Sequence, residues 1–277
     1  MKYNRSILAT IVLYKINLYD SKTFLSLSES LKEQNICMDL VVYDNSPVYN
    51  KDTILIHPNW RITYIEDVNN SGVSKAYNTA ATIAESLGKN WIAFFDQDTT
   101  FPENTIDSYI NALNDYPNYK LFAPLMFSNT TIISPCRFKF MRGASFKNVA
   151  IGVNKLQNTS VINCGMCVDI DAFNKNNGYN ELLKLDFSDH DFVRRLEKNV
   201  TNEFVVIDLK VQHELSTKSK NSLDSDLIRF DYYLSGGKNI ESSVIEKRLV
   251  KFNAIMRSIK LSLIHQSISF LTKALKS

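Results

Sequence analysis

Apolar and polar positions along the first hundred residues alternate between the period of a strand and that of a helix. Short apolar runs predict strands at residues 7–14, 39–44, 61–66 and 91–96. Between them, apolar residues at helical spacing predict helices over 22–33 and 72–87, and Gly88 ends the second. Strands that alternate with helices predict an α/β fold with a mainly parallel central sheet, flanked by helices on both faces.

The pattern is less regular after residue 101. It predicts helices at 102–113 and 189–198 and strands at 121–127, 161–170 and 204–211, whereas 129–158 shows no clear periodicity. From about residue 225 the pattern is helical almost to the end. We therefore expect one α/β domain over residues 1–224, followed by a C-terminal helical extension over 225–277.

Charge is distributed unevenly along the chain. The whole chain carries +3, but residues 244–277 hold seven Lys and Arg against one acid, so this segment carries +6 and the remainder −3. The same segment has apolar residues at helical spacing: Ile245, Leu249, Phe252, Met256, Ile259 and Leu263. A basic amphipathic helix predicts contact with an anionic membrane surface. The alternative is a helix that packs on the rest of the chain or on a second copy in a homodimer. No aromatic and basic recognition motif accompanies the charge, so we expect no nucleic-acid partner.

Hydropathy and cysteine spacing point to a protein of the cytoplasm. No apolar run reaches the roughly 18–20 residues that a membrane span needs. The first run follows Lys2 and Arg5 as in a signal peptide, but it is short and ends at Lys15 rather than at a cleavage site. Cys164 and Cys167 have C-x-x-C spacing without a second pair for zinc, and we expect free, packed thiols.

Three carboxylates follow predicted strands. Asp44 ends the strand at 39–44, and Asp96 and Asp98 come directly after WIAFF. Because the carboxyl ends of parallel strands line one crevice, we expect these side chains to face the same ligand. Two carboxylates separated by one residue can hold Mg²⁺ or Mn²⁺ together with substrate phosphates. A solvated turn is the alternative for this tripeptide alone.

Five motifs follow one another along the chain: ILATIVLYK, VVYDNSP, NNSGVSKAYNTA, FFDQDTTFP and the segment 163–196. In this order they resemble glycosyltransferase family 2, and especially its rhamnosyltransferase-like branch. The resemblance implies the GT-A fold and inverting transfer of a sugar from a nucleotide diphosphate. It also implies a nucleotide-sugar half over about residues 1–100 and an acceptor half over about 101–224.

The resemblance implies roles for individual residues of the first half. It places Asp44, Asn70 and Gly72 around the nucleotide, with Lys75 and Asp96 as further donor-binding residues. Gly72 would allow close approach of the backbone. The other interpretation of residues 70–72 is a turn that leads into a helix.

The metal ligands implied by the resemblance are Asp96, Asp98 and His213. An imidazole suits Mn²⁺ in mixed nitrogen and oxygen coordination, so we expect Mn²⁺ or Mg²⁺ as the cofactor. A single histidine after a strand is, however, often only structural.

The segment Asp189-His190-Asp191 is the predicted source of the catalytic base. A carboxylate near the acceptor hydroxyl can take its proton, and the family pattern assigns this role to Asp189, with Asp191 as its neighbour. His190 is expected to be a bystander. Helix capping is the alternative role for Asp189, although Ser188 could cap instead.

The resemblance implies a donor of dTDP-L-rhamnose or a UDP-hexose and an acceptor in a growing bacterial surface polysaccharide, O-antigen or capsule, including lipid-linked forms. The enzyme would act in the cytoplasm, on the inner face of the cell membrane. The sequence departs from the family at residues 235–238, SGGK, where an Arg-Asn pair is common, so Lys238 or Arg229 could replace that arginine.

Two other functions stay open. A sugar nucleotidyltransferase would also use two carboxylates, but it needs a glycine-rich phosphate loop that LYKINLYD lacks. A catalytically inactive, membrane-associated glycan-assembly subunit is disfavoured by the intact Asp96, Asp98 and Asp189. The absence of P-loop and G-x-G-x-x-G motifs argues against an NTPase and a nicotinamide enzyme.

Overall fold

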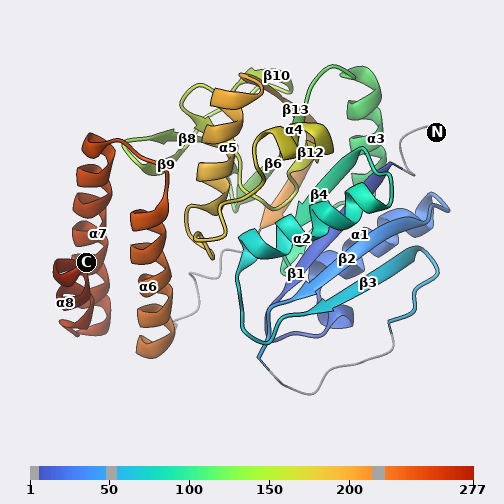
Figure 1. Cartoon of the computed structure of the whole chain (residues 1–277). Helices are drawn as coiled ribbons and strands as arrows, with labels where there is room; N and C mark the ends of the chain where they lie inside the picture. The colour runs from blue at the N-terminus through green and yellow to red at the C-terminus, as the bar shows by residue number, and fades with distance from the viewer. Residues whose placement is uncertain (1–5, 48–54, 214–221) are drawn as a thin grey trace.

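The computed structural model describes residues 6–47, 55–213 and 222–277. Lys2 and Arg5 of the N-terminal sequence lie outside these ranges. The described chain forms a large mixed sheet with helices on both faces and a group of C-terminal helices at one side (Figure 1).

The large sheet has the order β10-β13-β6-β12-β4-β1-β2-β3, with β5 and β7 paired to β13 and β6. Its strands are β1 Ile7–Leu13, β2 Met38–Asp44, β3 Trp60–Glu66, β4 Trp91–Phe95, β5 Thr99–Thr100, β6 Leu121–Ser128, β7 Thr131–Ser134, β10 Gly152–Lys155, β12 Cys167–Asp169 and β13 Glu203–His213. The pairs β3–β2, β2–β1, β1–β4 and β6–β13 are parallel, whereas β12 runs antiparallel between β4 and β6. The predicted mainly parallel sheet is confirmed.

Two hydrophobic cores lie on opposite faces of this sheet. Helices α1 (Lys22–Glu33) and α3 (Thr105–Asp115) cover one face, while α2 (Val73–Ser86), α4 (Ile170–Lys175) and α5 (Ser188–Asn199) cover the other. Successive residues of β1 point to opposite faces of the sheet. Ile7 and Ile11 belong to the core under α1 and α3, and Leu8 and Val12 belong to the core under α2, α4 and α5. This two-residue alternation explains why the strand is apolar throughout.

Residues 129–158, which showed no clear periodicity, form short strands. Besides β7 and β10, β8 (Cys136–Lys139) and β9 (Arg142–Ser145) form a hairpin that joins β11 (Thr159–Ser160) in a three-stranded sheet. The tip of this hairpin contacts a C-terminal helix, because the Asn253 side-chain amide donates to the Phe140 carbonyl at 3.0 Å. A short 3₁₀ helix, η1 (Leu18–Asp20), precedes α1.

The predicted strand over 161–170 is wrong in its extent. Only Cys167–Asp169 is strand, and Ile170 already begins α4. Gly165 interrupts the run with φ +80, and a Cβ there would lie 2.7 Å from Cγ of Pro124. The run is apolar because it is buried rather than because it is extended.

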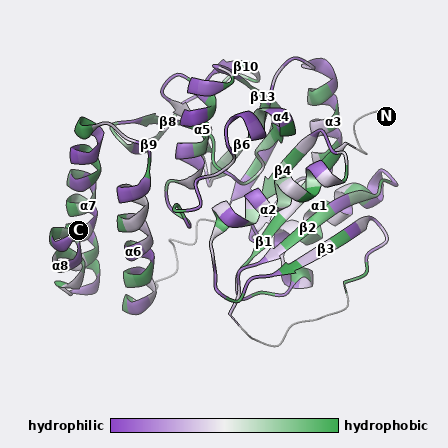
Figure 2. Ribbon diagram, viewed as in Figure 1, coloured by the Kyte–Doolittle hydropathy of each residue, from purple (hydrophilic) through white to green (hydrophobic). Residues whose placement is uncertain are grey.

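The C-terminal extension consists of α6 (Leu223–Asn239), α7 (Val244–His265) and α8 (Ser269–Lys276). Helix α6 lies against the segment before α5, since a Cβ on Gly236 would be 2.7 Å from the Asp186 carbonyl oxygen. Hydrophobic and hydrophilic residues alternate along α6 and α7 (Figure 2). Among the described residues, no helix combines the length and apolarity that a membrane crossing requires.

Candidate active site

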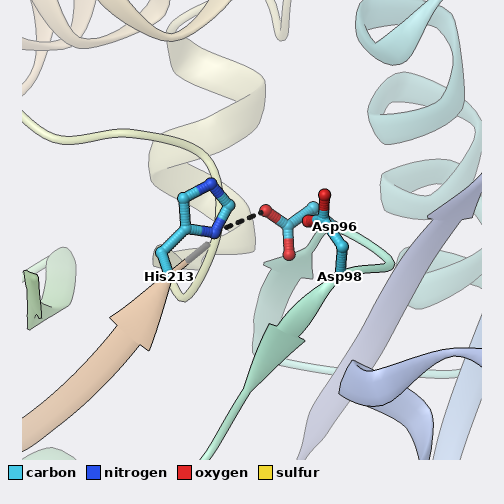
Figure 3. Close-up of side chains that lie close together, drawn as sticks. All are labelled: Asp96, Asp98 and His213. Carbon is cyan, nitrogen blue, oxygen red and sulfur yellow. Dashed lines mark ion pairs between the residues drawn. The ribbon is translucent and has the colours of Figure 1, made fainter. Parts of the chain in front are cut away.

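Asp96, Asp98 and His213 lie together at the carboxyl ends of β4 and β13 (Figure 3). Each offers a ligand atom within 4.8 Å of the other two, and no other metal-binding group of three is found among the described residues. The Nδ1 atom of His213 is 3.5 Å from Oδ2 of Asp96. Two carboxylates and one imidazole fit a cation such as Mn²⁺, which accepts mixed oxygen and nitrogen ligands.

Strand pairing brings His213 to the two carboxylates. The loop after β4 continues into β5, which pairs antiparallel with the end of β13, so that His213 lies opposite Thr99. A histidine more than a hundred residues away in sequence therefore reaches the loop that carries Asp96 and Asp98.

Thr99 and Cys164 form hydrogen bonds to the side chains of this cluster. The Thr99 hydroxyl donates to Oδ1 of Asp96 at 2.7 Å and lies 2.7 Å from Nδ1 of His213. The Thr99 hydroxyl therefore bridges Asp96 and His213 and holds both side chains in place.

The Cys164 thiol donates to Oδ1 of Asp96 at 2.9 Å. Burial raises the pKa of Cys164, and the charge of Asp96 adds to the effect, so the sulfur keeps its proton. Cys164 and Cys167 are both free and buried, as predicted. The contact of Cys164 with the cluster had no signal in the sequence.

Asp98 is the carboxylate most affected by its surroundings. Burial raises its pKa, and repulsion from Asp96 raises it further, while His213 acts in the opposite direction. Two crowded carboxylates in a half-buried site are stabilised by a cation between them.

Asp44 is buried at the end of β2. Its Oδ1 accepts the Ser46 backbone N–H at 2.8 Å, and its Oδ2 accepts a short hydrogen bond from the Tyr64 hydroxyl. The parallel pairing of β2 with β1 places Asp44 opposite Leu13, at the same edge of the sheet as the metal cluster.

Asn70, Gly72 and Lys75 contact the segment that leads to α5. Gly72 has φ +101, and a Cβ there would lie 2.5 Å from the carbonyl oxygen of Lys184. The same oxygen accepts the N–H of Val73 at 2.9 Å. The Asn70 carbonyl lies 3.5 Å from Nζ of Lys184, and Lys75 is 3.4 Å from Glu181. The close backbone approach at Gly72 is therefore an approach to Lys184.

Asn78, the sixth residue of α2, forms three hydrogen bonds to this segment. Its amide accepts from the Tyr179 N–H at 2.8 Å and donates to the Tyr179 carbonyl at 3.0 Å and to Glu181 at 2.9 Å. No role was predicted for Asn78, although it lies within the motif NNSGVSKAYNTA. Helix α2 thus connects the nucleotide-side motifs to the predicted acceptor side.

Asp189 lies in the first turn of α5 with 20% of its side chain exposed. Its Oδ1 accepts the His190 N–H at 2.7 Å, and no side-chain cap is present at this end of the helix. The Ser188 hydroxyl, considered above as a cap, donates instead to the Leu185 carbonyl at 2.9 Å. His190 stacks on Phe138 with ring centroids 4.2 Å apart.

Asp191 is 2% exposed and ion-paired. Its Oδ2 accepts from Nε of Arg195 at 2.8 Å, and its Oδ1 accepts the Glu241 N–H at 3.2 Å. Asp191 also borders a cavity of about 320 Å³ together with Arg194 and Arg195, and none of the metal-cluster residues lines that cavity. Its carboxylate therefore joins α5 to the segment between α6 and α7.

Asp189 and Asp96 act on the same buried side chain. Burial raises the pKa of Tyr77 well above its usual value, and the charges of Asp96 and Asp189 raise it further. The predicted base and the predicted metal ligand therefore both lie within electrostatic range of one phenol of α2.

Asp186 was not singled out in the sequence, although it lies three residues before Asp189. Burial raises its pKa, whereas Arg257 and Arg229 lower it. The Oδ1 atom of Asp186 is 3.5 Å from Arg257, whose guanidinium lies 4.3 Å from the ring centroid of Tyr233. Lys238, the other candidate for the missing arginine, is exposed near the end of α6.

The sequence model of Glycosyl transferase family 2 matches residues 21–171, which is more than half of the chain. The chain belongs to this family. The matched region contains Asp44, Asn70, Gly72, Asp96 and Asp98, whereas the second predicted cluster and His213 follow it. No curated protein matches the sequence.

Solved structures of the same fold extend the comparison over the whole chain. S. aureus TarS is 15% identical with a TM-score of 0.53 over 93% of this chain, which spans only 44% of that TarS chain. S. aureus TarS 1–349 in complex with UDP is 14% identical, with a TM-score of 0.54 over 92% of this chain and 72% of that one. GalNAc-T7 with UDP, GalNAc and Mn²⁺ is 11% identical, with a TM-score of 0.62 over 100% of this chain and 55% of that one. These family 2 and fold similarities confirm the GT-A fold, while the rhamnosyltransferase-like branch stays a prediction.

Proposed function

We propose that this family 2 glycosyltransferase moves a sugar from a nucleotide diphosphate donor to a saccharide acceptor with inversion, and that it depends on a divalent cation. The observation that carries the proposal is the cluster of Asp96, Asp98 and His213 at the carboxyl edge of the sheet. This edge is where ligands bind in open α/β sheets.

The donor set supports Mn²⁺ or Mg²⁺ as the cofactor. Asp96 and Asp98 supply hard oxygen ligands, His213 supplies an imidazole nitrogen, and the Thr99 hydroxyl contacts both Asp96 and His213. When bound, the cation would neutralise charge on the diphosphate leaving group. The protein fixes the ligands in advance, because Thr99 and Cys164 both hold Oδ1 of Asp96 and leave Oδ2 available.

We assign the catalytic base to Asp189. A single displacement with inversion needs a carboxylate that removes the acceptor hydroxyl proton. The partial exposure of Asp189 supports this role, and among the described residues its carboxylate has no Lys or Arg partner, only the imidazole of His190 at 3.7 Å. Asp191, which is committed to Arg195, is better explained as the residue that positions α5.

We propose that Asp44 and Asp96 contact the donor nucleotide and ribose, as the family resemblance implies. Asn70, Gly72 and Lys75 then belong to the wall that joins the donor and acceptor sides, since their partners are Lys184 and Glu181. UDP is present in the structures of TarS 1–349 and GalNAc-T7, which supports a UDP-linked donor; dTDP-L-rhamnose is the alternative.

The acceptor in this proposal is a growing bacterial surface polysaccharide, O-antigen or capsule, made on the cytoplasmic face of the membrane. The nucleotide-sugar half would span about residues 1–100 and the acceptor half about 101–224. The extension over 225–277 completes the acceptor wall, because α6 contacts Asp186 and the backbone of Glu241 binds Asp191.

The test is release of nucleotide from UDP- and dTDP-sugars with a panel of glycan acceptors, in Mn²⁺ and in excess EDTA. Asp98→Asn should abolish turnover, whereas Asp107→Asn, which changes an exposed carboxylate on α3, should not. The anomeric configuration of the product, read by NMR, should be inverted. Turnover that persists in EDTA would contradict the dependence on a divalent cation. Retention of the anomeric configuration would contradict the assignment of Asp189 as the base of a single displacement. Binding of nucleotide without turnover on any acceptor would favour the inactive assembly subunit.

A further inference from the structure

Helix α7 has two opposite faces, and only one of them is packed. Its buried residues are Val250, Ala254 and Ser258. These residues are small, and Val250 fits against Gly237 of α6, where a Cβ would meet its Cγ1 at 2.5 Å. Compact side chains therefore bring the helix close to the rest of the protein, and its large apolar residues are left for the other face.

The outer stripe of α7 consists of large apolar residues that are between 41% and 75% exposed: Ile245, Phe252, Met256, Ile259 and Leu263. At about 100° per residue they fall within a sector of about 60°, directly opposite the packed face, and they extend over about 27 Å of helix. The predicted apolar positions are thus present, but most of them do not pack on the catalytic domain. Only Leu249 among them is partly buried against it.

Cations border the outer stripe on both sides. Arg248 and Lys251 lie on one flank and Lys260 on the other, and all three are exposed without an ion-pair partner among the described residues. Glu246 is the only acid between residues 242 and 277, and it is held by Arg194 at 2.7 Å.

Two of the three acids of α6 are paired within the extension. Asp226 is paired with His265 at 2.8 Å and Asp231 with Lys273 at 2.6 Å, whereas Asp224 is exposed in the first turn of α6. Further exposed apolar residues, Ile264, Ile268 and Leu275, continue from the end of α7 into α8. The outer face of α7 is therefore apolar and cationic together.

We propose that the outer stripe of α7 docks on an anionic lipid bilayer, with its apolar side chains in the interfacial region and its cations at the headgroups. An apolar stripe between Lys and Arg residues suits a helix that lies in the membrane plane. A second copy of the chain is a poorer occupant, because Arg248, Lys251 and Lys260 of two copies would face one another without enough acids to pair them. Charge complementarity thus selects the anionic surface.

The test is co-sedimentation of the full chain with phosphatidylcholine vesicles, with and without phosphatidylglycerol. We expect binding only with phosphatidylglycerol, and its loss as salt is raised. Phe252→Glu with Leu263→Glu should lower partitioning by about 100-fold, because two apolar anchors are removed. The matched control is Leu25→Glu, which adds an acid at a half-exposed leucine of α1 and should bind as the wild type does.

A second variant separates charge from apolar contact. Replacing Arg248, Lys251 and Lys260 with glutamine leaves the outer stripe intact and should weaken binding at low salt by about fivefold for each cation. Melting temperatures and light scattering check that the variants fold and stay in the wild-type oligomeric state. Vesicle binding uses no nucleotide sugar, so its result is independent of the proposed catalysis.

Three results would overturn the proposal. The first is that the wild type does not bind phosphatidylglycerol vesicles at low salt. The second is that the double glutamate variant binds them as strongly as the wild type does. A stable dimer that Phe252→Glu and Leu263→Glu dissociate would show that the outer stripe is an interface between copies of this chain.

Discussion

Replacing Asp191 with asparagine should destabilise the protein far more than it impairs the chemistry of the molecules that stay folded. Asp191 is 2% exposed, and the side chain of its partner Arg195 is only 15% exposed. Removing one charge of such a pair leaves the other buried without compensation, which costs about 3–5 kcal/mol. Asparagine can still accept one hydrogen bond, and Arg195 keeps its hydrogen bonds to the carbonyls of Asn176 and Gly178. We therefore expect the free energy of unfolding to fall by about 3 kcal/mol, the lower end of this range.

The magnitude is large enough to measure by thermal unfolding. For a chain of this size, about 3 kcal/mol lowers the melting temperature by roughly 6–12 °C. Asp189→Asn is the matched variant, two residues away on the same helix turn. Its only described hydrogen bond is from the N–H of His190, so we expect less than about 1 kcal/mol of destabilisation. Its turnover should fall by roughly 10²–10⁴.

Both variants are assayed below the lower of the two melting temperatures, with turnover corrected for the folded fraction by circular dichroism. The reasoning is refuted if Asp191→Asn melts like the wild type yet loses turnover by more than Asp189→Asn. That result would indicate that Asp191 is the catalytic base and that its ion pair with Arg195 does not stabilise the fold.

Two further variants test contacts of the site. Gly72→Ala should lower the melting temperature by several degrees, because the φ of +101 and a Cβ at 2.5 Å from the Lys184 carbonyl each cost about 1–3 kcal/mol. The control is Gly88→Ala, at φ +65 with open space around the Cβ, which should lower the melting temperature less. Equal decreases in melting temperature would contradict the close approach at Gly72. Thr99→Val keeps the volume but removes the hydroxyl between Asp96 and His213, so Mn²⁺ affinity, measured by calorimetry, should fall about 10–100-fold with little change in melting. Unchanged affinity would show that Thr99 does not orient the ligands.

Local periodicity predicted the elements of the first half closely. The helix over 22–33 is observed with the same ends, because its apolar residues Phe24, Leu27 and Leu31 all face one core. The prediction of a strand over 161–170 was wrong in its extent, because an apolar run there reflects burial and not an extended backbone. A buried loop around Gly165 is as apolar as a strand, and only its tertiary contact with Pro124 explains its shape.

The candidate site was predictable where residues are close in sequence. Asp96 and Asp98 follow one strand, and this placement pointed to a shared ligand. The hydrogen bond of Cys164 to Asp96 and the contact of Thr99 with His213 join segments that are distant in sequence, and no spacing encodes them. Likewise, helical spacing found the outer stripe of α7, but the small residues that pack opposite it decide which face is exposed.

The central claim is that Asp96, Asp98 and His213 hold a cation that binds the donor diphosphate. Its most direct test is the melting shift caused by UDP or dTDP with Mn²⁺ and with excess EDTA, in the wild type and in Asp98→Asn. At 100-fold excess over the dissociation constant, nucleotide should stabilise the wild type by about 2.7 kcal/mol in Mn²⁺. In EDTA, and in Asp98→Asn, that shift should disappear. An equal shift in EDTA, or an undiminished shift in Asp98→Asn, would contradict the claim.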